Sequence, residues 1–387
     1  PLGLDGPGRD TPAYPEITVR VAAHVATHRG ARDRSALDAY AAAVAAYADA
    51  VRCRATVVAE GAVVANCSRV SDAFVGAAAL VEGSTVEEAT LLSSADERTS
   101  VRGGACVRRA LLQWSAEVDE LGCVNEAVMC EHSHVDKHGK LLGSLLGPNS
   151  GVSEGEVSAS LVGPFVGFHH QALLIAAMWP EGKGNVGYGA NVGSNHTSKA
   201  PDQEIRPGEG VFFGLGVSIK FPSNFQRSPY SIIATGVVTL PQTLAFPFSL
   251  VNLAGESVKG LSPAINELFA GWVLSDSVFT VWRNQQKFAT RQHSRRDRCD
   301  PEVFRPDIVD LMLDARRRLA SPRGKARFHT DGGEEVWTDK EVVGMGKNYL
   351  RESIRVKGIK AYTFYARLYA LHGLVRAQAA GLSLAPL

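Results

Sequence analysis

The stretch Val64-Ala-Asn-Cys-Ser-Arg-Val70 decides the fold, because it displays a six-residue repeat that returns along the middle of the chain. Small or polar residues mostly fill the steps between the aliphatic positions. A period of six fits neither a helix, at about 3.6 residues per turn, nor a half-buried strand that alternates every two. It is typical of a solenoid of very short strands in which one large residue per step points inward. The aliphatic positions are Val58, Val64 and Val70, then Val75 and Val81, Val101 and Val107, and Val118 and Val124.

These hexads resemble the hexapeptide-repeat superfamily of left-handed parallel β-helices over roughly residues 58–250. The resemblance implies a mainly β fold, a left-handed parallel β-helix solenoid with helical N- and C-terminal additions. It also implies a homotrimer with active sites in the clefts between subunits. Members of that superfamily are mostly acyltransferases, and others are zinc enzymes like the γ-class carbonic anhydrases. The chain is also similar to a group of large bacterial β-helix proteins with no assigned activity.

Changes in composition divide the chain into three expected regions. An N-terminal arm and helix is expected over residues 1–55, because Ser35 to Val51 is rich in alanine with apolar residues at helical spacing. The β-helix is expected over 56–255, with an inserted loop at 179–210 where Gly, Asn and Pro are dense. A helical region is expected over 256–387. Its signals are an amphipathic pattern from Pro306, a capping-box spacing at Thr338 to Glu341, and apolar positions from Ile359 to Ala379.

Composition excludes several classes of function for these 387 residues. The net charge of +1 gives no electrostatic reason to expect nucleic acid or an anionic membrane as a partner. No apolar run reaches the roughly 20 residues that a membrane span needs. Six cysteines without a CxxC spacing favour packed thiols. The first residues lack the basic leader and apolar core of a signal peptide, so we expect a cytoplasmic protein that acts on a small-molecule substrate.

Six of the eleven histidines fall between His132 and His196, and the first interpretation of this cluster is group transfer. Asn195-His196 in a loop rich in Gly and Asn resembles the Asn-His loop of hexapeptide acetyltransferases. The resemblance implies that His196 is the general base, supported by Asn195, Asp202 and Glu204. An acyl-CoA or acyl-carrier donor is then the expected cofactor. Cations around the loop that would meet its phosphate or carboxylate groups are Lys183, Lys199 and Lys220.

The second interpretation is a zinc site formed by His132, His134, His169 and His170. His134 and His170 lie 36 residues apart, which is two coils if each coil holds three hexads. They would then share one column about 10 Å apart, and a neighbouring subunit would supply the intervening ligand. Such a zinc ion would activate water for hydration, hydrolysis or lyase chemistry.

A third interpretation is a non-catalytic trimeric scaffold, with the histidines lining a polar surface. The basic run Arg291 to Arg298 is interpreted as an exposed linker. Acyl or related group transfer to a small polar acceptor is the leading prediction, with a histidine base in a cleft between subunits.

Overall fold

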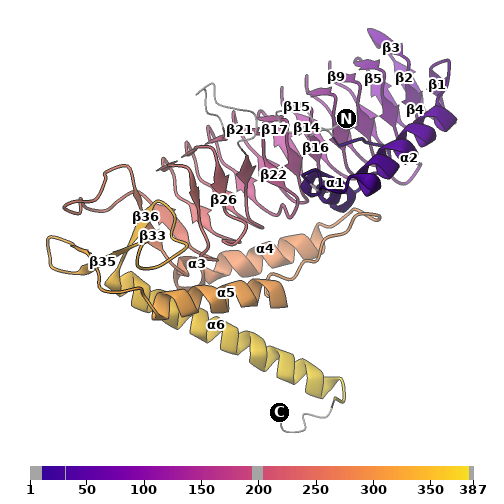
Figure 1. Ribbon diagram of the computed structural model, residues 1–387. Helices are drawn as coiled ribbons and strands as arrows, with labels where there is room; N and C mark the ends of the chain where they lie inside the picture. Colours follow the sequence, from indigo (N-terminus) through magenta and orange to yellow (C-terminus); the bar gives the residue numbers. More distant parts are fainter. Residues whose placement is uncertain (1–10, 31, 194–203, 383–387) are drawn as a thin grey trace.

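The six-residue repeat builds a parallel β-solenoid with helices at both ends of the chain, as the computed structural model in Figure 1 shows. The structure describes residues 11–30, 32–193 and 204–382. Within them, about 11 turns stack one above the next. The predicted mainly β solenoid with helical additions is therefore confirmed.

Each turn contributes short strands to three sheets that form the faces of the solenoid. The first face is an 8-stranded sheet: β1 (Val57–Val58), β4 (Phe74–Val75), β7 (Thr90–Leu91), β10 (Leu111–Leu112), β13 (Val128–Met129), β16 (Leu145–Leu146), β19 (Leu161–Val162) and β22 (Met178–Trp179). Through a bridge between Ala177 and Ile205 this face meets a 3-stranded sheet of β25 (Ile205–Arg206), β28 (Ser223–Asn224) and β31 (Gln242–Thr243).

The second face is the solenoid part of a 15-stranded sheet: β2 (Val63–Ala65), β5 (Leu80–Glu82), β8 (Ser100–Val101), β11 (Glu117–Val118), β14 (His134–Asp136), β17 (Gly151–Ser153), β20 (Gly167–Phe168), β23 (Asn185–Val186), β26 (Phe212–Phe213), β29 (Ile232–Ile233) and β32 (Leu250–Asn252). The third face is a 10-stranded sheet: β3 (Arg69–Ser71), β6 (Thr85–Glu87), β9 (Cys106–Arg108), β12 (Cys123–Asn125), β15 (Lys140–Leu142), β18 (Glu156–Ser158), β21 (Leu173–Ile175), β24 (Asn191–Val192), β27 (Ser218–Ile219) and β30 (Val238–Thr239).

The repeat length is shorter than three full hexads. Val118 pairs with Val135 and Val135 with Val152, a step of 17 residues per coil rather than 18. The corner between the third and the first face uses a residue fewer, because a single residue with positive φ turns the chain there, as at Asp72 (52°) and Glu126 (52°). Val118, Val135 and Val152 point inward and are fully buried, and so are the predicted positions from Val75 to Val124, whereas Val58 and Val64 on the first coil are 50% and 39% exposed.

The expected loop at 179–210 is wrong in its described part, because β23, β24 and β25 fall within it and β22 ends at its first residue. The described glycines and asparagines of this range occupy corners and short strands of the coils. Part of the range, 194–203, lies outside the described residues.

The end of the solenoid nearer the C-terminus is covered by strands as well as helices, which corrects the expectation of a purely helical region. β33 (Asn266–Phe269) pairs antiparallel with β32, and the sheet continues through β36 (Asn348–Arg351), β35 (Glu335–Thr338) and β34 (Phe328–His329). The Thr338 backbone N–H donates to the Glu341 carboxylate at 3.1 Å, as in a capping box, but the Thr338 hydroxyl donates to the same carboxylate at 2.7 Å, and the two residues lie in a turn that no helix follows directly.

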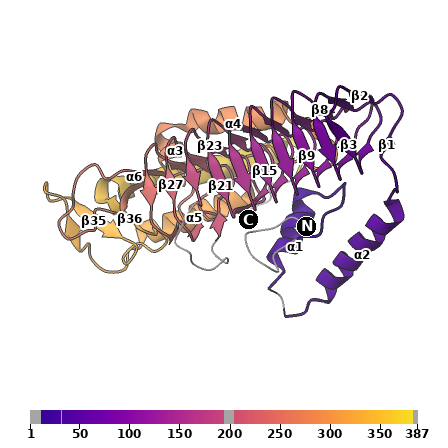
Figure 2. The same ribbon diagram turned by 90° about the horizontal axis from the view of Figure 1, so that it is seen from above.

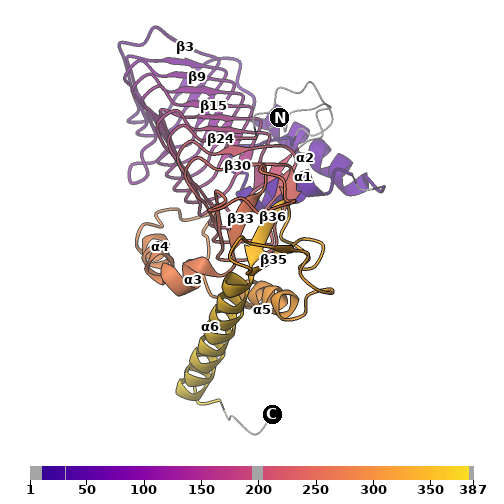
Figure 3. The same cartoon turned by 90° about the vertical axis from the view of Figure 1, so that its left-hand side faces the viewer.

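Four helices pack around this end: α3 (Trp272–Asp276), α4 (Val278–Thr290), α5 (Pro306–Ala320) and α6 (Glu352–Ala379). Helix α5 agrees with the predicted pattern from Pro306. Phe304 stacks between Phe248 of the solenoid and Tyr365 of α6, with ring centroids 5.6 Å and 5.9 Å away. In Figure 3 the far half of α6 extends away from the solenoid.

The N-terminal helices differ in how they pack. Helix α1 (Val19–Thr27) buries Val19, Ala22 and Val25 against the 8-stranded face. Helix α2 (Ser35–Val51) has the predicted bounds, but none of its residues is fully buried. Its apolar side is half-buried, and the Tyr40 hydroxyl on that side donates to the Pro12 carbonyl at 2.7 Å. Figure 2 shows α2 standing away from the coils. No described helix is long and apolar enough to cross a membrane.

Candidate functional site

One outward-facing column of the 15-stranded sheet brings chemistry-bearing side chains into line. The strand registers place Glu117, His134, Gly151, Gly167, Asn185, Phe212 and Ile232 on successive coils of one column. Neighbouring positions of such a column are about 4.8 Å apart, so adjacent side chains contact each other. The column therefore runs from charged through imidazole and amide groups to apolar ones.

The two adjacent glycines leave room for imidazole rings to lie against the sheet. A Cβ added at Gly151 would stand 2.1 Å from Nε2 of His134, and one added at Gly167 would stand 3.1 Å from Nε2 of His169. A larger residue at Gly151 would displace the His134 ring. We call His134, Gly151, Gly167, His169 and Asn185 the imidazole groove.

The pKa of His169 is lowered, although part of the side chain is exposed to solvent. Burial lowers its pKa most, the side-chain hydrogen bond with Asn185 raises it, and the charges of His170, Lys287 and His134 lower it further. The net pKa lies below the ordinary value of about 6.5. A neutral imidazole whose N–H is fixed by an amide oxygen offers its other nitrogen as a base.

Helix α4 crosses the same face beyond Asn185 and encloses a hollow of about 750 Å³. We call it the α4 hollow. Its floor includes Asn185, Phe212 and Ile232, so the column continues from the imidazole groove directly into it. The cations Arg283, Lys287 and Arg291 line the α4 side, and no described carboxylate is among the lining residues. The hollow is therefore electropositive.

Lys183 lines the hollow too, but its ammonium is not available to a cofactor, which corrects the prediction for this residue. The Nζ atom lies 2.7 Å from Oε1 of Glu209, with the two side chains 4% and 8% exposed. Arg305 and Tyr230 donate to the same carboxylate, at 2.6 Å and 2.7 Å. Burial alone would raise the pKa of Glu209, but the Arg305 hydrogen bond and the Lys183 charge bring it below its ordinary value. Lys183 is a structural ion-pair partner.

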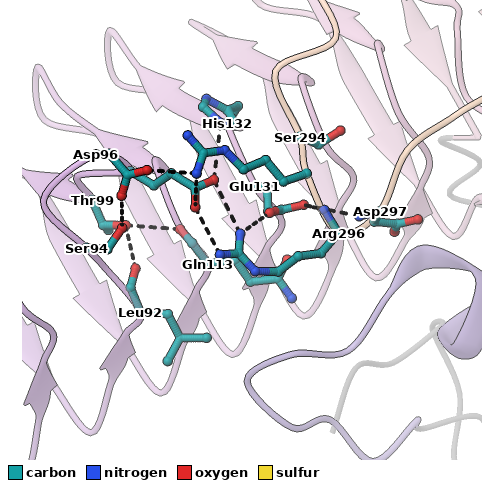
Figure 4. A network of polar contacts seen from close by, with 12 residues as sticks. Leu92, Ser94, Asp96, Thr99, Gln113, Glu131, His132, Ser294, Arg296 and Asp297 are labelled. Atoms are coloured by element: carbon teal, nitrogen blue, oxygen red, sulfur yellow. Dashed lines mark hydrogen bonds and ion pairs between the residues drawn. The ribbon is translucent and has the colours of Figure 1, made fainter.

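A basic segment after α4, residues 291–300, lies along the solenoid, and we call it the strap. Arg296 donates to the buried carboxylates of Glu97 and Glu131, and its guanidinium lies 3.7 Å from the centre of the Trp114 ring (Figure 4). Glu131 also accepts the backbone N–H groups of Arg296, at 2.9 Å, and Asp297, at 3.2 Å. The segment is exposed over most of its length, as expected, but it is not a free linker, because Arg295 and Arg296 anchor it to the coils.

His132 belongs to this strap contact. It occupies a corner with φ of 55°, two residues before β14, so it does not share the face of His134 as a continuous strand would require. Its Nε2 is buried without a hydrogen-bond partner, 4.0 Å from Glu97, and its ring centre lies 5.6 Å from that of His293. Burial and the charge of His293 lower its pKa.

The predicted zinc ligands do not converge within the part of the chain that the structure describes. Two coils after His134 stands Gly167, because these coils take 17 and 16 residues rather than 18 each, so His170 lies off that column. His170 lies at a corner, with Nδ1 2.9 Å from the Glu154 carboxylate, and both side chains are exposed. Among described residues no group of three His, Cys, Asp or Glu side chains is placed to hold a metal ion.

The predicted transferase loop lies mostly outside the described residues, which include neither Asn195 and His196 nor Lys199 and Asp202. Glu204 is described and forms an ion pair with Arg206 at 3.1 Å. It precedes β25, on a different face from the imidazole groove. Lys220 is exposed after β27.

Sequence reasoning missed the α4 hollow. The available signal was the spacing of Arg283, Lys287 and Arg291, four residues apart in a helical segment, which places them on one side of a helix. The spacing alone did not predict a binding site, because nothing in the expected helical region 256–387 places this segment beside the solenoid.

The chain is similar to sequences without an assigned activity. A family model described as "Domain of unknown function (DUF4954)" matches residues 4–321. An "Uncharacterized protein" of Treponema pallidum (strain Nichols) is 26% identical over 285 residues, covering 73% of this chain and 38% of the relative. The chain therefore spans well under half the length of that relative.

Proposed function

The chain belongs to the DUF4954 family, and from its own geometry we propose that it transfers an acyl or related group to a small polar acceptor. The observation that carries the proposal is His169, a neutral imidazole oriented by Asn185 at the edge of an electropositive hollow. Transfer of a group from an anionic donor requires a base, a residue that orients this base and a positively charged site for the donor.

The chemistry assigned to His169 is proton transfer. Its free imidazole nitrogen removes the proton of an acceptor hydroxyl or amine, and the freed oxygen or nitrogen attacks the acyl carbonyl. The bond from the carbonyl to the donor sulfur breaks, and the imidazolium returns the proton to the leaving thiolate. Asn185 is a positioning residue in this scheme, because its amide selects the tautomer of the imidazole.

Three further features belong to the proposal. The donor is an acyl-CoA or acyl-carrier thioester, as the resemblance to hexapeptide-repeat enzymes implies. The working form is a homotrimer, in which a neighbouring subunit closes the outward-facing imidazole groove. The setting is the reducing cytoplasm, which all six free cysteines support.

The test compares two candidate bases in one assay. Purified protein is given acetyl-CoA and a panel of small hydroxyl and amine acceptors, and thiol release is followed. His169→Gln should lower kcat by about 100-fold or more while KM for the donor stays unchanged. The matched control, His329→Gln, alters an exposed histidine on β34 and should have no effect. Chelation with EDTA should also leave the rate unchanged.

Two outcomes would overturn this assignment. If His196→Ala abolishes transfer while His169→Gln does not, the base is in the loop predicted from sequence. If the wild-type protein transfers no acyl group to any acceptor, the transferase proposal fails.

A second candidate function is a non-catalytic scaffold, which the apolar surface beside α2 favours. Tyr47 and Val51 on α2 are 37% and 58% exposed, and Phe74 on the first coils is 40% exposed. They line one hollow of about 730 Å³. Under this alternative, Tyr47→Ser would disrupt assembly measured by light scattering, whereas His169→Gln would change nothing measurable.

A further inference from the structure

We propose that the α4 hollow binds a ligand carrying two or more adjoining phosphate groups, held by Arg283, Lys287 and Arg291. The site does not depend on the role assigned to His169. It is formed by α4 on one side and by strands β23, β26 and β29 on the other.

The first argument is the spacing of the three cations. They follow one another at four-residue intervals, so their Cα atoms rise by about 6 Å per step along one side of the helix. Long arginine and lysine side chains from such positions can converge on neighbouring phosphates, and arginine forks bind phosphate oxygens in pairs. A single phosphate would engage only part of this row.

The second argument is that the positive charge has no counterion in the described part of the molecule. No described carboxylate lines the hollow, and none forms an ion pair with Arg283, Lys287 or Arg291. Most other basic side chains of this surface are paired, as Arg295 is with Asp96 at 2.7 Å. A row of like charges on one helix face opposes folding unless an anion neutralises it.

The third argument is the position of Lys287. This side chain is only partly exposed, and burial lowers its pKa, with further lowering by the charges of Arg291 and Arg283. A bound polyphosphate would reverse these effects, because opposite charge favours the ammonium form.

The uncharged lining of the hollow fits an organic group attached to the phosphates. Asn185 on the floor and Asn284 and Thr280 on α4 offer neutral hydrogen-bonding groups, while Phe212, 39% exposed, and Ile232 offer apolar surface. A volume of about 750 Å³ is in the range of small-molecule sites. The favoured class is therefore a small organic di- or triphosphate.

The experiment measures binding to the full chain by titration calorimetry, with inorganic pyrophosphate, tripolyphosphate and orthophosphate as probes. Pyrophosphate and tripolyphosphate should bind more tightly than orthophosphate, and raising the salt concentration should weaken binding. Arg283→Gln and Lys287→Gln should each weaken pyrophosphate binding by about 10-fold or more. The matched control, Lys325→Gln, removes an exposed lysine outside the hollow and should change affinity less than about twofold.

Several results would overturn the proposal. One is the absence of pyrophosphate or tripolyphosphate binding at millimolar concentration. Another is equal weakening by Lys287→Gln and by the control. A third is binding only to RNA or to anionic vesicles. Arg283 is exposed, so Arg283→Gln keeps the test decisive even if Lys287→Gln fails to fold.

Discussion

Replacing Glu209 by glutamine should destabilise the protein strongly, because one carboxylate neutralises two buried cations. Lys183 and Tyr230 each lie 2.7 Å from Oε1, and Arg305 reaches both carboxylate oxygens, at 3.0 Å and 2.6 Å. Removing one partner of a buried ion pair costs about 3–5 kcal/mol, since the other charge stays buried. For a chain of this size we expect the melting temperature to fall by about 6–10 °C.

The matched control is Glu126→Gln, which breaks an ion pair of similar length in water. Glu126 lies 2.9 Å from Arg109, but both side chains are about half exposed. Exposed pairs contribute about 0.2–1 kcal/mol, so the melting temperature should barely move. Thermal unfolding of both variants is followed by circular dichroism, and hydrogen exchange shows which part of the molecule loses protection. Equal shifts for both variants would refute the reasoning.

The same carboxylate predicts an acid dependence of stability. The folded-state pKa of Glu209 is lowered, so its contribution is complete above the unfolded value of about 4.3 and is lost as the pH falls through the folded pKa. Glu209→Gln should therefore lose less stability than the wild type on acidification through that range.

Three other variants or conditions test the groove and the strap. Arg296→Met should speed hydrogen exchange of the amides that Glu131 accepts by about 10-fold or more, because the strap loses its guanidinium anchor. Gly151→Ala should displace the His134 ring and lower stability by about 1–3 kcal/mol in denaturant unfolding, since the new Cβ would overlap it. The lowered pKa of His169 places the acid limb of the activity profile below about pH 6.5, and the folded state gains stability as the pH rises through that limb.

Each of these expectations has its own control. Arg298→Met alters an exposed strap arginine without a side-chain contact to Glu131, and should leave exchange unchanged. Gly373→Ala adds a methyl group to α6 with no atom within 4 Å, and should not destabilise. Asn185→Ala should move the acid limb to lower pH, because the Asn185 hydrogen bond raises the pKa of His169. If the acid limb of the activity profile of Asn185→Ala stays at the wild-type pH, the result would argue against that hydrogen bond.

The solenoid was predictable because its core repeats. Burial alone requires apolar residues at the inward positions, so the repeat of aliphatic residues in the sequence predicts Val118, Val135 and Val152. The corner length was not predictable. A coil of 17 residues and one of 18 show the same aliphatic beat over a few turns, and only strand pairing distinguishes them.

The shorter coils decide which histidines meet. Over two coils they place Gly167, and not His170, in the column of His134, and His170 lies at a corner beside Glu154. His169 lies in the imidazole groove through the neighbouring glycines, which the sequence does not mark as special. The α4 hollow was missed for another reason, because the floor strands β23 to β29 precede α4 by roughly 50 to 100 residues in the sequence and no local pattern joins them.

The strap has a consequence for how the protein is made. Coils stack on their immediate predecessors and can form in order as the chain leaves the ribosome. The contacts of Asp297 with Val19 and of Arg296 with Glu131 join residues 278 and 165 positions apart, so they close only after the chain has been translated past Asp297. During synthesis the chain therefore passes through a stage in which the coils are stacked but the strap is not yet bound to them. A ligand that recognises the surface formed by the strap and the coils would bind only molecules in which the strap is in place.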